Sequence, residues 1–220
     1  MKLKKKGIIG LLVVANMIGF GPIGNAVAAE TEKKSNYVQY KAGMIQPTSG
    51  FDDAGYDTGF NDSLSYGRYL TNHLILEGTI DGSITKNKHN GTNNTAGNYT
   101  QKNNIDVTAF LLTLKEEYSV GHINLYGGAG FGAYVAHLYS KIDSDRFGTF
   151  KMDEYSDAVF GAHLLAGANY NITESWYLGI EGMYRWTGKA KIETSAITVP
   201  VAYNDNLNGF TLGASLGFRF

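Results

Sequence analysis

Residues 209–220 have the sequence GFTLGASLGFRF, in which two kinds of side chain alternate. Apolar side chains occupy one parity: Phe210, Leu212, Ala214, Leu216, Phe218 and Phe220. Small or charged groups occupy the other: Thr211, Gly213, Ser215, Gly217 and Arg219. Because side chains along a β-strand point to opposite faces in turn, this pattern predicts a strand with one apolar and one polar face.

The same alternation runs over residues 176–186, where the apolar parity begins with Trp176 and ends with Trp186. Aromatic side chains at both ends of an apolar face are typical of a strand that crosses a bilayer, because they lie at its two interfaces. Residues 122–137 and 158–170 alternate as cleanly. We expect six large side chains to face lipid: Trp176, Trp186, Phe131, Phe160, Phe210 and Phe218.

Eight strands are predicted in all: 37–46, 59–70, 73–82, 105–118, 122–137, 158–170, 176–186 and 210–220. The segment 105–118 alternates least well, because Leu111 interrupts its pattern. Four connections are long, at about 47–58, 83–104, 138–156 and 189–207. Three are short, at about 71–72, 119–121 and 171–174.

Long and short connections therefore alternate, which predicts an all-β, eight-stranded antiparallel up-and-down transmembrane β-barrel. In such a barrel the short turns and both termini are periplasmic and the long loops are extracellular. The segment 83–104 is rich in Asn, Gly, Thr and Lys and has no apolar period, so it is predicted to be a solvated loop.

Residues 1–28 are predicted to be a secretion signal. Four lysines (Lys2, Lys4, Lys5 and Lys6) precede an apolar run from Gly7 to about Gly21, and Ala26-Val27-Ala28 form an A-x-A cleavage site. The run is too short for a membrane-spanning helix. A short N-terminal segment, 29–36, and a barrel domain, 37–220, would follow.

Composition excludes some functions. Removing residues 1–28 takes four of the 19 basic side chains and leaves 15 against 20 acidic ones, a net charge near −5, which does not favour a nucleic-acid partner. The chain has no cysteine, which excludes thiol catalysis and thiolate metal sites.

Three stretches resemble a known group, the small bacterial outer-membrane barrels of the OmpA, OmpX and OmpW type. They are YGGAGFG at 126–132, LTNHLILE at 70–77 and the ending GFTLGASLGFRF. The glycine-rich fifth strand, the four long loops and the ending Gly217-Phe218-Arg219-Phe220 are most similar to OmpW-type proteins. The resemblance implies an outer-membrane location among lipid and lipopolysaccharide. It also implies that Phe220 is the signal to the barrel-assembly machinery.

The inward parity of these strands carries charges of both signs: Lys41, Glu77, Asp81, Lys115, Glu117, His163, Glu181, Arg185 and Arg219. An eight-stranded barrel is just wide enough for its own side chains, so these charges must pair in a packed polar lumen. We expect Glu77 or Glu181 to pair with Lys41, Lys115 or Arg185, and inward glycines to leave room for Tyr126, Tyr134 and Tyr177. The network is either a plug that fills the lumen or a gate whose ion pairs switch.

Three classes of function follow. The resemblance implies a porin-like, narrow passage for small, hydrophobic solutes, and the alternative is a non-conducting structural or adhesive barrel at the cell surface. A lipid-modifying or proteolytic barrel would need a nucleophile and a base to converge. Four residues close in sequence suggest this set, but they also fit an ordinary polar loop: His137, Ser140, Asp143 and Asp145. We therefore predict no enzymatic activity, no cofactor and no metal site.

Overall fold

The computed structural model describes residues 35–48, 55–93, 97–146, 148–192 and 203–220. The predicted secretion signal, 1–28, lies outside the described residues, as does the segment 29–36 up to residue 34. Within the described ranges no helix is long and apolar enough to cross a membrane.

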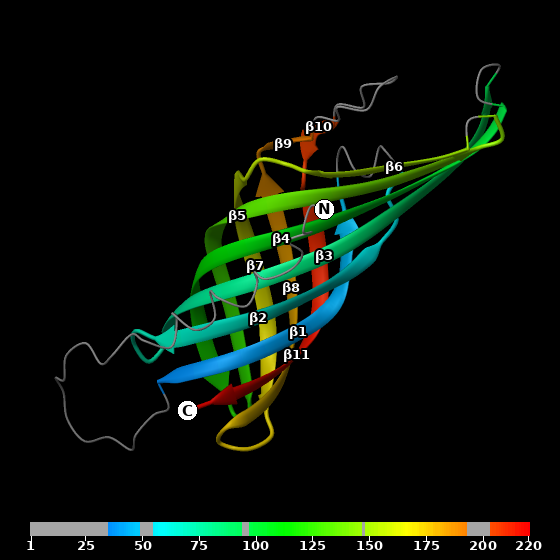
Figure 1. Ribbon diagram of the computed structural model, residues 1–220. Coiled ribbons are helices and arrows are strands. Elements are labelled where there is room, and N and C mark those ends of the chain that lie inside the picture. The colour runs from blue at the N-terminus through cyan, green and yellow to red at the C-terminus, as the bar shows by residue number, and fades with distance from the viewer. Residues whose placement is uncertain (1–34, 49–54, 94–96, 147, 193–202) are drawn as a thin grey trace, which may run out of the picture. The chain divides into compact units, whose positions relative to one another are not determined.

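Eight antiparallel strands close into a ring (Figure 1): β1 (Asn36–Pro47), β2 (Gly59–Tyr69), β3 (Leu74–Asn93), β4 (Gly97–Val120), β5 (Ile123–Ser144), β7 (Val159–Asn171), β8 (Trp176–Thr187) and β11 (Gly209–Arg219). Each strand of the ring pairs with the next, and β11 pairs with β1, which closes it. The predicted eight-stranded up-and-down barrel is confirmed. Three further strands lie outside the ring: β6 (Gly148–Tyr155) beside β5, and β9 (Lys189–Ile192) paired with β10 (Tyr203–Asn206).

The outer surface of the ring is apolar. Phe160 is 77% exposed and Phe131 is 63% exposed, and Trp176, Trp186 and Phe210 are exposed as well. Phe218 is half-buried, because its ring centroid lies 4.9 Å from that of Trp176. A band of large apolar side chains on the outside, with polar groups inside, is the polarity of a barrel that faces lipid.

The barrel has two distinct ends. The short β2–β3, β4–β5 and β7–β8 connections lie at the end that we call the turn end, together with Phe220 (Figure 1). The β4–β5 turn is shorter than predicted, because Val120 still pairs with Ile123. Gly121 makes this tight turn possible, since its φ of 63° is a left-handed conformation that glycine adopts without strain. Strands β2 and β3 leave out Leu70 and His73, which the prediction had included.

The prediction of a solvated loop at 83–104 was wrong. β3 continues to Asn93, β4 begins at Gly97, and the two pair without interruption from Leu74 opposite Glu116 to Asn93 opposite Gly97. The predicted connection 138–156 likewise contains the end of β5 and all of β6, and 189–207 contains β9 and β10. The upper parts of β3 and β4 carry polar side chains on both faces, so they show no alternation of apolar and polar residues. Their backbone groups still pair with each other.

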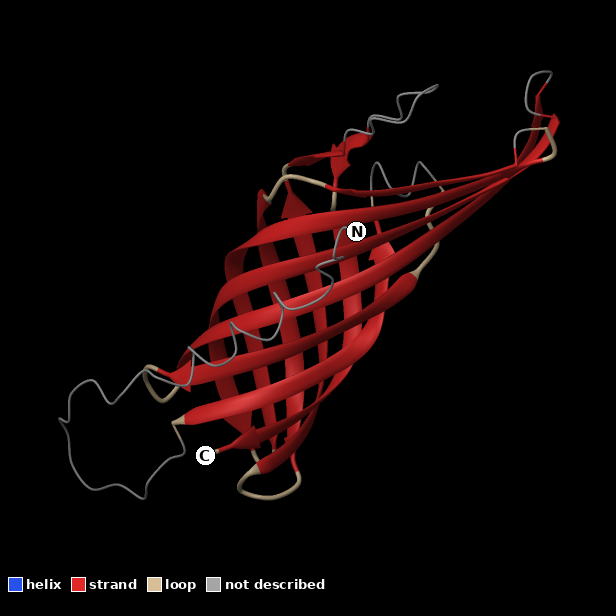
Figure 2. Cartoon of the chain, viewed as in Figure 1, coloured by secondary structure: helices blue, strands red, loops and turns tan. Residues whose placement is uncertain are grey.

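The ends of β3, β4 and β5 therefore join β6 in a four-stranded sheet that projects beyond the barrel (Figures 1 and 2). We call it the arm and define it as residues 86–93, 97–104, 139–144 and 148–155. Figure 2 shows β3, β4 and β5 running on from the barrel wall into the arm without an intervening loop. The end of the barrel that bears the arm is called the arm end.

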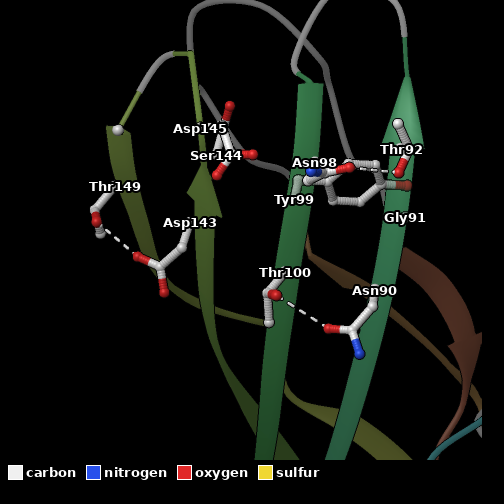
Figure 3. Close-up of a pocket in the computed structure, with 11 residues that line it drawn as sticks. Asn90, Gly91, Thr92, Asn98, Tyr99, Thr100, Asp143, Ser144, Asp145 and Thr149 are labelled. Carbon is white, nitrogen blue, oxygen red and sulfur yellow. Dashed lines mark hydrogen bonds between the residues drawn. The ribbon is translucent and has the colours of Figure 1, made fainter.

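The tip of the arm holds an open pocket of about 530 Å³ (Figure 3). Both hairpins contribute to its lining: Asn90, Gly91, Thr92, Asn98, Tyr99, Thr100, Asp143, Ser144, Asp145, Gly148 and Thr149. Two hydrogen bonds brace the strands here, from Thr100 to Asn90 at 3.0 Å and from Thr149 to Asp143 at 2.6 Å. Apart from Gly91 and Gly148, every residue that lines the pocket carries a hydroxyl, amide or carboxylate group.

Candidate functional site

The nine charged or ionisable residues predicted to face inward are all buried in the lumen: Lys41, Glu77, Asp81, Lys115, Glu117, His163, Glu181, Arg185 and Arg219. No other Asp, Glu, Lys, Arg or His among the described residues is buried to this degree. The set contains four acids, four bases and one histidine, so the formal charges balance. The charged members form three tiers along the barrel.

The middle tier is a chain of four charged groups. Lys41 Nζ lies 2.5 Å from Glu181 Oε1, and Lys115 Nζ lies 3.2 Å from Glu181 Oε2 and 2.7 Å from Glu77 Oε2. Both glutamates therefore contact lysine, and Lys115 bridges them. Buried charges this close offset their desolvation cost only because each also has hydrogen-bond partners.

Tyrosines supply those further partners. Tyr37 donates to Glu77 Oε2 at 2.5 Å, and Tyr126 donates to Glu181 Oε2 at 3.0 Å. Three inward tyrosines lie directly opposite glycines of the neighbouring strand: Tyr37 opposite Gly67, Tyr126 opposite Gly167, and Tyr177 opposite Gly217. A Cβ on any of these glycines would lie within 2.4 Å of the tyrosine ring, so the rings occupy the space that the missing side chains leave.

A second tier lies at the turn end. Glu117 Oε2 and Arg219 Nη2 are 3.9 Å apart, a looser pair than those of the middle tier. Tyr69 donates to Glu117 at 2.8 Å, and Arg219 donates to Asn171 at 2.6 Å. The guanidinium of Arg219 also lies over the ring of Tyr177, 4.3 Å from its centroid, a favourable cation–π geometry.

The third tier lies nearer the arm end. Asp81 Oδ1 and Arg185 Nη1 are 3.8 Å apart, again looser than in the middle tier. Arg185 Nε donates to the carbonyl of Leu207 at 2.8 Å, and Asn61 donates to Asp81 at 3.0 Å. Because Leu207 lies between β10 and β11, Arg185 ties a connection at the arm end to the lumen.

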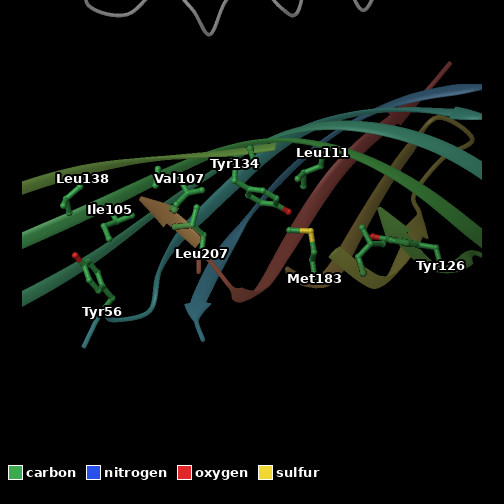
Figure 4. Close-up of a cluster of buried hydrophobic side chains, with 13 residues drawn as sticks. Tyr56, Ile105, Val107, Leu111, Tyr126, Tyr134, Leu138, Met183 and Leu207 are labelled. Atoms are coloured by element: carbon green, nitrogen blue, oxygen red, sulfur yellow. The ribbon is translucent and has the colours of Figure 1, made fainter. Parts of the chain in front are cut away.

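The predicted polar lumen describes only part of the interior. Toward the arm end the inner wall formed by β4 and β5 is apolar and includes Leu111, with Met183 and Leu207 in the same cluster (Figure 4). The inward side chains of β3 at this end, Ser83 and Thr85, are polar. The buried cluster consists of Tyr56, Ile105, Val107, Ala109, Leu111, Tyr126, Tyr134, Ala136, Leu138, Leu165, Met183, Ala190 and Leu207. Leu111 interrupted the predicted alternation because β4 is apolar on both of its faces here, one toward lipid and one toward the lumen. That run of apolar residues was a signal in the sequence for an apolar part of the lumen, as were Leu165 and Met183 on the inward parity of their strands.

The lumen leaves little empty space beside the outer tiers. One cavity of about 10 Å³ is bordered by Tyr69, Glu117 and Arg219, and another of about 10 Å³ by Ile105, Arg185 and Leu207. A cavity needs roughly 10–15 Å³ to hold one water molecule. Each of these spaces is therefore about the size of a single water.

His163 lies inside the lumen, whereas His137 of the candidate catalytic set lies outside it. His163 Nε2 lies 2.8 Å from Thr113 Oγ1 inside the lumen. His137 points to the outer face of β5, where it contacts Asp153 and lies 3.9 Å from Asp106. Ser140 is buried on the opposite face and donates to Asn103 at 2.6 Å.

His137 and Ser140 are thus on opposite sides of one strand. The other two residues of the set, Asp143 and Asp145, line the pocket at the tip of the arm. The structure does not bring the four residues together.

Phe220, the predicted assembly signal, lies at the turn end and is half exposed. Its backbone N–H donates to Asn36 at 2.9 Å and its carbonyl accepts from Asn36 at 3.1 Å. Its ring stacks beside Phe218 at 6.2 Å between centroids. Phe220 therefore marks the seam where β1 and β11 close the barrel.

Comparison with known proteins agrees with this architecture. The sequence model of the outer membrane protein β-barrel domain matches residues 17–220. The chain belongs to this family. The protein is therefore an integral protein of the outer membrane. A comparison with curated protein sequences finds no significant match.

Solved structures that share its fold include the following two. Neisserial surface protein A has 19% sequence identity and a TM-score of 0.52, over 84% of this chain and 97% of its own. OprG from Pseudomonas aeruginosa has 13% identity and a TM-score of 0.54, over 86% of this chain and 97% of its own. At these identities the likeness is one of fold alone.

Proposed function

We propose that this protein is a closed outer-membrane anchor that displays the arm at the cell surface for binding. In this proposal the arm and the long connections are extracellular and the turn end is periplasmic. The observation that carries it is the contrast between a lumen crossed by a tight ion-pair chain and an arm with an open polar pocket. This is the non-conducting, adhesive alternative that the sequence left open.

The middle tier supports the closed lumen. An ion crossing the barrel would have to separate contacts of 2.5–3.2 Å among Lys41, Glu181 and Lys115. Each separated charge would then be buried without its partner, which costs several kcal/mol. We infer a plug rather than a gate, because the tyrosine hydroxyls hold both glutamates in place from the sides.

The pocket supports the binding role. Its Tyr99 ring lies across Gly91, where a Cβ would come within 2.5 Å of the hydroxyl oxygen. The same pocket is lined by hydroxyl and amide groups from Thr92, Asn98 and Thr100. An aromatic ring among donors and acceptors suits a ligand rich in hydroxyl groups, and we propose an oligosaccharide.

Two measurements test the proposal. The refolded chain in a planar bilayer is expected to give no discrete conductance steps. In nanodiscs it is expected to bind members of an oligosaccharide panel, with affinity reduced about tenfold by Tyr99→Ala. Tyr118→Ala, at the other end of β4, is the matched control and should bind as the wild type does.

Steady conductance of the unmodified barrel would refute the closed lumen. Absence of binding to every sugar on the panel, or equal binding by Tyr99→Ala, would refute the pocket's role. Migration on gels before and after boiling checks that each variant has folded into a barrel.

A second candidate function is a narrow passage for small hydrophobic solutes. The apolar lining at the arm end favours it, because Ile105, Leu111 and Met183 would solvate such molecules better than water does. Discrete conductance steps that small hydrophobic solutes block would support this function over the closed anchor.

We further propose that Phe220 is recognised by the barrel-assembly machinery, which its exposed position at the β1–β11 seam supports. Phe220→Ala is expected to lower the amount of barrel in the outer membrane, with Phe210→Ala on the same face of β11 as the control.

A further inference from the structure

Four lysines form one row across the arm. Lys88 of β3 lies opposite Lys102 of β4, Lys102 lies opposite Lys141 of β5, and Lys141 lies opposite Lys151 of β6. Neighbouring strands are ~4.8 Å apart, so the row is about 14 Å long. We call these four residues the lysine row.

The lysine row lies on the face of the sheet that faces lipid lower down. Pairing between β3 and β4 is unbroken, so even-numbered residues of both strands stay on the outer face from Leu112 and Phe110 up to Lys102. Ile84 is exposed on this face at the rim, and Lys88 follows four residues later, about 13 Å farther along the strand at ~3.3 Å per residue. The row therefore stands just beyond the apolar band.

Such a row is unfavourable by itself. Like charges directly opposite each other in a sheet destabilise it. Within the row, only Lys141 has a carboxylate within 4.0 Å among the described residues, that of Asp143 at 2.7 Å, and the charge of Lys102 acts on this same carboxylate. Two further acids of this face lie beside His137 instead: Asp153 contacts it, and Asp106 lies 3.9 Å away.

Protection of a sheet edge does not account for the row. Lysines on edge strands discourage pairing with other chains, which would explain Lys88 and Lys151. Lys102 and Lys141 stand on the two inner strands, which have no free edge. These two lysines share the single carboxylate of Asp143, so the row keeps an excess of positive charge that an anionic partner outside the chain would balance.

We propose that the lysine row binds the phosphate groups of phosphorylated lipid headgroups in the outer leaflet and so tethers the arm to the membrane surface. The charge is complementary, and the row continues the lipid-facing surface of the same strands. The inference rests on the proposed extracellular orientation of the arm. It does not depend on the oligosaccharide pocket at the tip.

The test compares two double variants with equal loss of charge. Lys102→Gln/Lys151→Gln removes half of the row, and Lys189→Gln/Lys191→Gln removes two exposed lysines of β9 as the control. The full barrel is placed in phosphatidylcholine nanodiscs that contain phosphatidic acid, and the lipids that stay bound after detergent extraction are counted by native mass spectrometry. Heat-dependent gel mobility confirms that each variant is folded.

We expect the wild type and the β9 variant to retain phosphatidic acid over phosphatidylcholine. The row variant should retain about tenfold less, because each lysine near an anionic surface adds to binding. Raising NaCl from about 0.05 to about 0.5 M should weaken retention by the wild type, since salt screens exposed charges.

Equal retention by the row variant and the wild type would overturn the proposal. So would a row that binds free inorganic phosphate or heparin but not phosphatidic acid, because its partner would then be a soluble anion. Trypsin added to intact cells tests the orientation separately: no cleavage in the arm would overturn the assignment to the outer leaflet. Loss of sugar binding in Tyr99→Ala with normal lipid retention would leave the lysine row in place, so the two proposals fail independently.

Discussion

The Lys115–Glu77 pair in the lumen and the Lys141–Asp143 pair on the arm have the same 2.7 Å separation between nitrogen and oxygen. Their surroundings differ: the side chains are 2% and 1% exposed in the lumen, but 34% and 38% exposed on the arm. Water can replace either partner on the arm and neither partner in the lumen. Equal geometry therefore has unequal consequences, because the cost of losing a partner is set by burial.

The largest effect is expected for Lys115→Met, which leaves Glu77 without a cation and Glu181 with Lys41 alone. Breaking a buried pair from one side costs about 3–5 kcal/mol, so the free energy of unfolding should fall by about that much. Lys141→Met is the matched change on the arm and should cost less than about 1 kcal/mol. Urea unfolding in micelles, followed by the fluorescence of Trp176 and Trp186, measures both. Equal losses in the two variants would mean that burial does not separate the pairs.

A somewhat smaller effect is expected at Leu111, which is four residues before Lys115 on the same face of β4. Leu111 is 6% exposed within the apolar part of the lumen, so Leu111→Ala should cost about 2–4 kcal/mol. Leu111→Met preserves volume and should cost less than about 1.5 kcal/mol. The same new residue, methionine, would thus be tolerated at 111 and not at 115. A severe loss in Leu111→Met would show that this half of the lumen also depends on more than volume.

The packing of the Tyr126 ring against Gly167 provides a third test. A Cβ at Gly167 would lie 2.4 Å from the Tyr126 ring and 2.5 Å from the carbonyl oxygen of Ile180, so Gly167→Ala should cost about 1–3 kcal/mol. Gly127→Ala is the control, because its nearest neighbour would be 3.8 Å away on the outer face. Unfolding in urea that does not distinguish the two variants would contradict the tight fit of Tyr126.

These contrasts also explain what sequence can and cannot predict. Period two assigned Trp176 and Phe210 to the lipid face and Lys115 and Glu181 to the inner parity, because a wall between lipid and lumen imposes that period on every strand. The register of neighbouring strands determines which lysine meets which glutamate. Register depends on the geometry of the whole ring, so the bridging position of Lys115 between Glu77 and Glu181 could not be derived from the order of residues.

The arm was missed for the converse reason. Residues 86–93 and 97–104 pair by their backbones and lie beyond the apolar band of the barrel, so no apolar period was required of them. The lysine row is visible in the sequence only as isolated lysines, and it becomes a row through three successive pairings. The sequence predicted the structure well in the barrel wall, which has an apolar outer face and a different inner face. It predicted the structure poorly in the arm, where both faces of β3 and β4 are polar.

The smallest effect is expected at Asp143, and it sharpens the opening comparison. Hydrogen bonds from Lys141 and Thr149 hold the pKa of Asp143 below its usual value of 3.8. A lowered folded-state pKa stabilises the arm at pH values above about 4, and that contribution is lost as the pH falls through the folded-state pKa. The chemical shift of the Asp143 carboxyl carbon should therefore titrate below 3.8 and move upward in Lys141→Gln, while Lys189→Gln leaves it unchanged. Because the carboxylate is exposed, the difference in urea midpoint between Asp143→Asn and the wild-type barrel should stay constant from about pH 5 to about pH 3, the range over which the Asp143 contribution begins to be lost. A difference that changes over this range would mean that the arm and the lumen unfold as one unit.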